Sequence, residues 1–244
     1  MEMFSYLPFE LWYHIFMYCD FLSKIRFRQV NKLAYLLEIH DFYYINWKYL
    51  DKLTEDILRN YKFIRYLDIS NNENIFDISY LTNLEILNAG NECGLDNFSL
   101  TKFNLVKLYA NNNSKITNVN GMKRLKILHA NDNCGIDDKG IENLDLIELS
   151  INRNKKIINI EHLKNLKTLN ISDNLIFSEN NIQNKKLEKL FATNCINVKN
   201  VSHLKKLNVL YADGECGIDK NGIKNLKLKI FLKFGNKKFK KEKF

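Results

Sequence analysis

Cysteine and histidine are the residues of this chain whose spacing could support metal binding or a disulfide. Cys93, Cys134 and Cys216 each begin a Cys-Gly-Leu/Ile-Asp run, and His162 and His203 recur at the same spacing as Cys93 and Cys134. A zinc ion holds its thiolates at about 2.3 Å, and a disulfide requires Cα atoms within about 7 Å of each other. Whether these cysteine and histidine side chains come within those distances therefore depends on the fold.

The spacing reflects a repeat that fills most of the chain. A leucine recurs at nearly constant intervals, at Leu67, Leu87, Leu108, Leu128, Leu149, Leu169, Leu190 and Leu210, and Phe231 continues the series more weakly. Apolar residues recur three before, two after and eight after each leucine, and most units have Asn five after it. This pattern, L-x-x-L-x-L-x-x-N-x-x-L, resembles the leucine-rich repeat and is held for about eight units.

The resemblance implies an α/β solenoid in which each unit gives one short strand, a turn and a return path. Units of about 20 residues are short for this class, so the convex side should be extended or 3₁₀ and lack long α-helices. The Asn side chain can satisfy backbone groups where the buried chain bends. Shorter and longer steps alternate between the leucines, which implies a double unit with two convex conformations in alternation.

This geometry argues against shared metal or disulfide sites. Strands stack about 4.8 Å apart, so residues two units apart are separated by about 10 Å. That distance excludes pairing of Cys93 with Cys134 and common ligation by His162 and His203, which should lie on the convex surface. Only Cys195 and Cys216, in neighbouring units, remain an open pair, and the favoured interpretation of the cysteines is that of small buried turn residues.

No catalytic signature is present. The sequence contains no glycine-rich phosphate loop, no H-E-x-x-H and no G-x-S-x-G. We therefore expect no enzymatic activity, no metal and no cofactor.

The segment 1–42 does not follow the repeat and has helical apolar spacing, with the single Pro at a position suited to a helix start. This segment resembles an F-box, ungapped from residue 7 to residue 32. The matching residues are Leu7, Pro8, Glu10, Leu11, Ile15, Phe16, Tyr18, Asp20, Ile25, Arg28, Val30, Asn31 and Lys32.

An F-box followed by a leucine-rich-repeat solenoid is a known architecture, and it implies the substrate-recognition adaptor of a Skp–cullin–F-box ubiquitin ligase. The resemblance implies that the F-box docks on the Skp subunit, while the solenoid tethers a target protein. The residues expected to carry the Skp contact, partly as core and partly as interface, are Leu7, Pro8, Leu11, Ile15, Phe16 and Val30.

The expected domain organisation has four parts. These are an F-box-like helical module at 1–42, a linker with a capping helix at 43–62, the solenoid at 63–236 and a basic tail at 237–244. The lysine-rich C-terminal segment should cover the last unit with apolar side chains and keep a charged outer face.

The side chains that flank the strand leucines should face the concave side. Large residues gain nothing from the core there, and exposed aromatics are typical interface anchors. The predicted target-binding residues are Tyr66, Tyr109, His129, Phe191 and Tyr211. Because this surface is mixed in charge, it favours a protein ligand over nucleic acid.

The net charge of +9 is concentrated at the end of the chain. Residues 224–244 contain nine Lys and one Glu, whereas the other residues hold 28 basic and 27 acidic side chains. Two alternatives therefore stay open: a plain interaction scaffold whose N-terminal helices only cap the solenoid, and a nucleic-acid or anionic-surface binder acting through the tail. With no signal sequence and no apolar stretch of about 20 residues, we expect no membrane span and an intracellular place, cytoplasmic or nuclear, in the host cell if the protein is viral.

Overall fold

The structure is a computed structural model of the 244-residue chain. It describes residues 9–19, 21–28, 41–42, 52–61, 63–100, 102–183 and 186–239. Three of the predicted Skp contacts, Leu7, Pro8 and Val30, lie outside these residues, as do residues 240–244 of the predicted tail.

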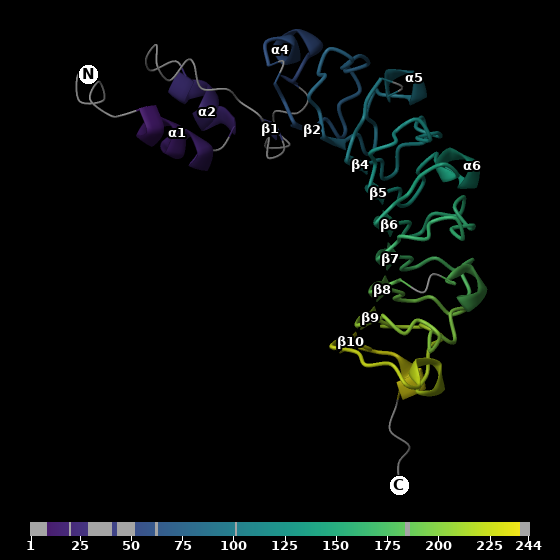
Figure 1. Cartoon of the computed structure of the whole chain (residues 1–244). Coiled ribbons are helices and arrows are strands. Elements are labelled where there is room, and N and C mark those ends of the chain that lie inside the picture. Colours follow the sequence, from purple (N-terminus) through teal and green to yellow (C-terminus); the bar gives the residue numbers. More distant parts are fainter. Residues whose placement is uncertain are drawn as a thin grey trace.

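Among the described residues, ten short strands form one parallel sheet in sequence order. They are β1 (Asp41–Phe42), β2 (Tyr66–Asp68), β3 (Ile86–Asn88), β4 (Lys107–Tyr109), β5 (Ile127–His129), β6 (Glu148–Ser150), β7 (Thr168–Asn170), β8 (Lys189–Phe191), β9 (Val209–Tyr211) and β10 (Ile230–Leu232). In Figure 1 the strands stack along the inner side of an arc, and the short helical turns lie on the outer side. The predicted leucine-rich-repeat solenoid is confirmed.

The repeated leucine lies at the centre of each strand from β2 to β9, and Phe231 takes its place in β10. Register pairs Leu67 with Leu87, and Leu87 with Leu108, so equivalent leucines stack along the interior. These side chains have 0% exposure, whereas the residues on either side of them point away from the core. Each unit can therefore bury its apolar side chains only against its neighbours.

A tight turn follows every strand from β2 onward. The fourth residue after the strand leucine has a positive φ in each unit, from Asn71 (φ 61°) to Gly214 (φ 60°) and Gly235 (φ 71°). Asn, Asp and Gly tolerate this conformation best, and Arg153 is the exception. Part of the high asparagine content is thus explained by turn geometry.

Buried asparagines join successive turns. Asn113 Nδ2 donates to the Ala89 carbonyl (2.8 Å), and its Oδ1 accepts from the Lys115 N–H (3.0 Å). At the corresponding position Cys195 Sγ donates to the Ile171 carbonyl (2.9 Å). The predicted role of the asparagine is confirmed. Equivalent bonds between units are made by Asn72, Asn154, Asn174 and Asn236.

The convex side alternates with the repeat length. The longer units carry a short helical turn: α5 (Asn97–Leu100), α6 (Asp138–Ile141), η2 (Glu179–Asn181) and η3 (Asn221–Ile223). The shorter units return in extended conformation, and η4 (Lys237–Phe239) follows β10. The expected alternation of two convex conformations is confirmed, and the extra residue accommodates the helical turn.

The N-terminal region contains α1 (Phe9–Tyr18) and α2 (Phe21–Arg28). These helices pack through Phe16 and Phe27, whose ring centroids are 6.1 Å apart. The Arg28 guanidinium lies 5.7 Å from the Tyr61 ring, which connects α2 with the residues before β2. None of the helices among the described residues is long and apolar enough to cross a membrane.

Helix α4 (Glu55–Arg59) packs on the first repeat. Thr54 caps its N-terminus by accepting from the Ile57 N–H (3.3 Å). Glu55 Oε1 accepts from the Phe76 and Asp77 N–H groups (2.9 and 2.8 Å). Strand β1 pairs with β2, so the sheet begins upstream of residue 63, the predicted start of the solenoid. The domain boundaries themselves stay predictions.

Replacing Asn154 with Ala is expected to lower the free energy of unfolding by about 2–3 kcal/mol, because the Ala130 carbonyl would lose its buried donor. Asn133→Ala is the matched control, since Asn133 occupies the same position of the sequence repeat but is exposed. We expect a change within about 0.5 kcal/mol for that variant. Urea unfolding followed by circular dichroism measures both, and equal losses would contradict the role given to Asn154.

Candidate functional site

The predicted target-binding side chains lie on the strand face that points away from the core. Tyr66 is 38% exposed, and Tyr109, His129, Phe191 and Tyr211 are half-buried. Each belongs to a strand and flanks a buried leucine, so the pleat directs its side chain outward. Whether these residues bind a target remains a prediction.

The residues on β4–β6 form one cluster. The Tyr109 and His129 rings meet edge to face, with centroids 4.7 Å apart, and Lys107 Nζ lies 4.6 Å from the Tyr109 centroid. His129 Nε2 is 2.8 Å from Glu148 Oε1. Aromatic, cationic and acidic groups are thus held together on one face, which suits the recognition of a mixed protein surface.

The residues on β8–β10 form an aromatic and aliphatic cluster. The Phe191 and Tyr211 rings lie 4.7 Å apart on adjacent strands. Beyond them, Ile230 and Leu232 of β10 are 46% and 45% exposed.

The described part of the lysine-rich C-terminal segment covers the last unit with some of its apolar side chains, as the sequence predicts, and leaves others exposed. Phe231 and Phe239 pack on the core. Ile230, Leu232 and Phe234 stay exposed, because the alternation along β10 turns their side chains away from the core.

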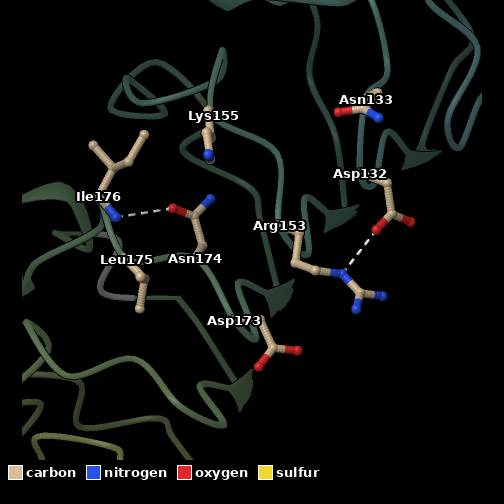
Figure 2. A pocket seen from close by; sticks show the side chains of 8 residues that line it. All are labelled: Asp132, Asn133, Arg153, Lys155, Asp173, Asn174, Leu175 and Ile176. Carbon is tan, nitrogen blue, oxygen red and sulfur yellow. Dashed lines mark hydrogen bonds and ion pairs between the residues drawn. The ribbon is translucent and has the colours of Figure 1, made fainter.

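A hollow of about 620 Å³ lies along the turns that follow β5–β7. Figure 2 shows Arg153 pointing toward Asp132, with a distance of 2.8 Å between Nε and Oδ1. The exposed side chains of Leu175 and Ile176 form the other part of its lining. The lining offers charge and apolar contact but no nucleophile paired with a base, so it suits surface recognition.

On helix α1, the predicted Skp contacts Leu11 and Ile15 are exposed, whereas the predicted contact Phe16 is buried. Leu11, Ile15 and Tyr18 follow i, i+4, i+7 spacing, which places them on one helix face, and they are 46%, 45% and 92% exposed. Phe16 is 1% exposed, and Lys24 Nζ lies 5.6 Å from its ring. The structure thus separates exposed from buried positions, which the sequence alone left undivided.

The repeat cysteines are buried in the turns. Cys93, Cys134, Cys195 and Cys216 are free thiols with at most 1% exposure, as expected for small turn residues. Burial raises the pKa of the Cys93, Cys134 and Cys216 thiols to about 11 and that of Cys195 to about 12. Within the described ranges, no group of three or more His, Cys, Asp or Glu side chains could hold a metal ion.

The two repeat histidines link neighbouring units. His162 Nε2 donates to the Ile141 carbonyl (3.0 Å), and His203 Nε2 donates to the Ile182 carbonyl (2.7 Å). Both side chains are half-buried. Each histidine on the return path thus joins its unit to the preceding one through a hydrogen bond.

Comparison with known proteins finds a family match for the N-terminal part of the chain and solved structures similar to most of the chain. The F-box domain profile matches residues 4–37. The chain is similar to the crystal structure of an internalin (inlF) from Listeria monocytogenes str. 4b F2365, with 26% identity and a TM-score of 0.53, over 73% of this chain and 56% of that one. It is also similar to the functional domain of InlJ from Listeria monocytogenes, described as including a cysteine ladder, with 16% identity and a TM-score of 0.46, over 71% of this chain and 45% of that one.

No curated protein sequence matches the chain significantly. The chain spans just over half the length of the inlF chain, so nothing of that protein's activity is transferred here. The F-box match and the parallel solenoid together confirm the resemblance seen in the sequence.

Alkylation of the native protein at pH 8 is expected to modify Cys19 first, because Cys19 is only half-buried. At a pKa of about 11, only about one thiol in a thousand is the reactive thiolate at this pH, and burial slows the other four cysteines further. Mass spectrometry after iodoacetamide treatment measures the order, and treatment in urea, where all five should react, is the control. Modification of Cys93, Cys134, Cys195 or Cys216 before Cys19 would contradict this expectation.

Proposed function

We propose that this chain, an F-box domain followed by a leucine-rich-repeat solenoid, is the substrate-recognition adaptor of a Skp–cullin–F-box ubiquitin ligase. The observation that carries the proposal is the F-box match at residues 4–37 joined to a repeat scaffold. F-box and leucine-rich-repeat modules bind other proteins and perform no catalysis. The adaptor itself would therefore break no bond, and it would act in the cytoplasm or nucleus, where such ligases assemble.

The proposed mechanism is tethering. A bound target is held at a high effective concentration near the ligase, because both binding modules are on one chain. The continuous sheet makes the solenoid a stiff arm, since each strand from β2 onward is bonded to its neighbour in fixed register. Target lysines would thereby stay within reach of ubiquitin transfer by the other subunits.

The Skp contact is assigned to the exposed face of α1. Leu11 and Ile15 supply apolar surface there, and Tyr18 extends the same face. Phe16 supports this surface from inside, since it packs against Phe27. On the resemblance alone, the proposed contact also includes Leu7, Pro8 and Val30.

The target contact is assigned to the concave face. Tyr109 and His129 would anchor a ligand on the N-terminal half, where Tyr66 lies two strands before Tyr109. Phe191 and Tyr211 would anchor it on the C-terminal half. Aromatic residues are among the residue types that most often dominate the binding energy of an interface, and here they lie partly exposed on a rigid face.

Replacing Leu11 and Ile15 with Asp is expected to weaken binding of a purified Skp subunit at least tenfold, since two exposed apolar contacts become charged. Met17→Asp is the matched control, because Met17 is 45% exposed but lies on another face of α1. Surface plasmon resonance measures the affinity. Absence of Skp binding by the unaltered chain would refute the ligase role and favour a plain interaction scaffold.

Replacing Tyr109 and Tyr211 with Ala is expected to release the target while Skp binding stays unchanged. The readout is affinity-purification mass spectrometry with the proteasome blocked, scored for ubiquitinated proteins that copurify with the adaptor. Phe98→Ala is the control, because Phe98 is 82% exposed on the convex side. Equal loss of those proteins in both variants would exclude the concave face as the target site.

A further inference from the structure

Strand β10 is an open edge of the sheet among the described residues. In earlier units the residue two after the strand leucine donates its N–H to the following strand, as Ala89 does to the Tyr109 carbonyl and Ala212 to the Leu232 carbonyl (both 2.8 Å). Lys233 occupies this position after Phe231. By the same register, the N–H and carbonyl groups of Phe231 and the N–H of Lys233 face outward, ready to pair with a further strand. The Lys233 carbonyl instead accepts from the Asn236 N–H of its own turn (3.1 Å).

An apolar row runs along this edge. Ile230, Leu232 and Phe234 alternate in sequence and are 46%, 45% and 90% exposed, while Phe231 turns toward the core and packs against Phe239 at 5.1 Å. Natural edge strands are usually protected by charges that replace such apolar side chains. Here lysines lie around the apolar row, and the side chains of the row itself stay exposed.

The charges of the last unit are all positive. All of its lysines are exposed, and none of the ion pairs found among the described residues includes one of them. Lys233 Nζ lies 5.5 Å from the Phe231 ring and 4.8 Å from the Phe239 ring, so its charge stays at the edge. Residues 220–239 contain no acidic residue and seven lysines: Lys220, Lys224, Lys227, Lys229, Lys233, Lys237 and Lys238.

Three carboxylates of the preceding unit, those of Asp213, Glu215 and Asp219, lie beside the last turn. Asp213 Oδ1 accepts from the Phe234 N–H at 2.5 Å. That oxygen is occupied by the scaffold itself, while Glu215 and Asp219 line a hollow together with Lys237 and Lys238. These three acids leave the seven lysines of residues 220–239 in excess. The edge therefore keeps a positive character.

We propose that the β10 edge binds an extended acidic segment of a partner protein as an additional strand. Its main chain pairs with Phe231 and Lys233, its apolar side chains contact Ile230, Leu232 and Phe234, and its carboxylates face the lysines. This proposal goes beyond the concave-face contact, because it uses the sheet edge, and it does not depend on Skp docking.

The positive charge of the lysines near β10 favours an acidic segment over the other possible ligands of this edge. A second copy of the chain would bring two sets of lysines together, which opposes association at this edge. A nucleic acid would use the lysines but neither the backbone groups nor the apolar row. An acidic strand uses all three features.

The test measures fluorescence anisotropy of labelled nonapeptides with the full chain. A peptide of alternating Glu and Val is expected to bind, and a peptide of alternating Lys and Val is expected to bind at least tenfold more weakly. Two further Glu–Val peptides carry N-methyl groups along one backbone edge or along the other. One is expected to lose binding and the other to keep it, because only one edge of an added strand pairs with β10.

On the protein side, Ile230→Ser combined with Leu232→Ser should weaken Glu–Val peptide binding at least tenfold. Phe98→Ser combined with Phe76→Ser is the matched control, since both residues are exposed on the return paths of the first units, away from β10. The proposal is overturned by equal binding of the Lys–Val peptide or by unchanged binding of both N-methylated peptides. Displacement of the Glu–Val peptide by lower concentrations of oligouridylate would assign the edge to nucleic acid, and a dimer broken by the Ile230 and Leu232 substitutions would assign it to a second copy.

Discussion

Buried asparagines of this solenoid satisfy backbone carbonyls of the preceding turn. Asn113 illustrates the interaction, because its amide donates to a carbonyl of the preceding unit while its oxygen accepts from its own turn. An unpaired buried carbonyl would cost about 1–3 kcal/mol. Stacking of the units, and with it the register of all later strands, depends on these bonds as much as on the leucines.

Fixed register turns a simple repeat into a binding surface. Because each strand from β2 to β9 places one buried leucine between two flanking side chains, which point outward in all of these strands except at the buried Ser150, the outward residues of successive units form continuous rows. Tyr109 and His129 meet edge to face for this reason, although they belong to different units of the repeat. The binding properties of such a molecule depend on which side chains occupy these outward rows, whereas the fold depends on the inward side chains.

The two ends of the stack differ. At the N-terminal side, α4 packs on the first repeat and binds its return path through Glu55, with the F-box helices before it. At the other side, β10 ends the described sheet with apolar side chains and lysines. A repeat protein must manage the apolar and hydrogen-bonding surface of its end units. This chain covers one end with a helix and leaves on the other a surface with distinct chemistry.

The leucine period by itself determined the strands, the inward and outward rows and the alternation of the convex side, since a repeat fixes which side chains face the core. It also indicated the F-box through a local pattern. The tertiary structure decided the features that depend on contacts between units. Asn154 is buried and hydrogen-bonded, whereas Asn133, at the same position of the repeat, is exposed. In that unit the neighbouring Cys134 is the buried residue. The tertiary structure likewise separated Phe16, buried against α2, from Leu11 and Ile15, because packing between elements chooses among apolar residues that periodicity treats alike.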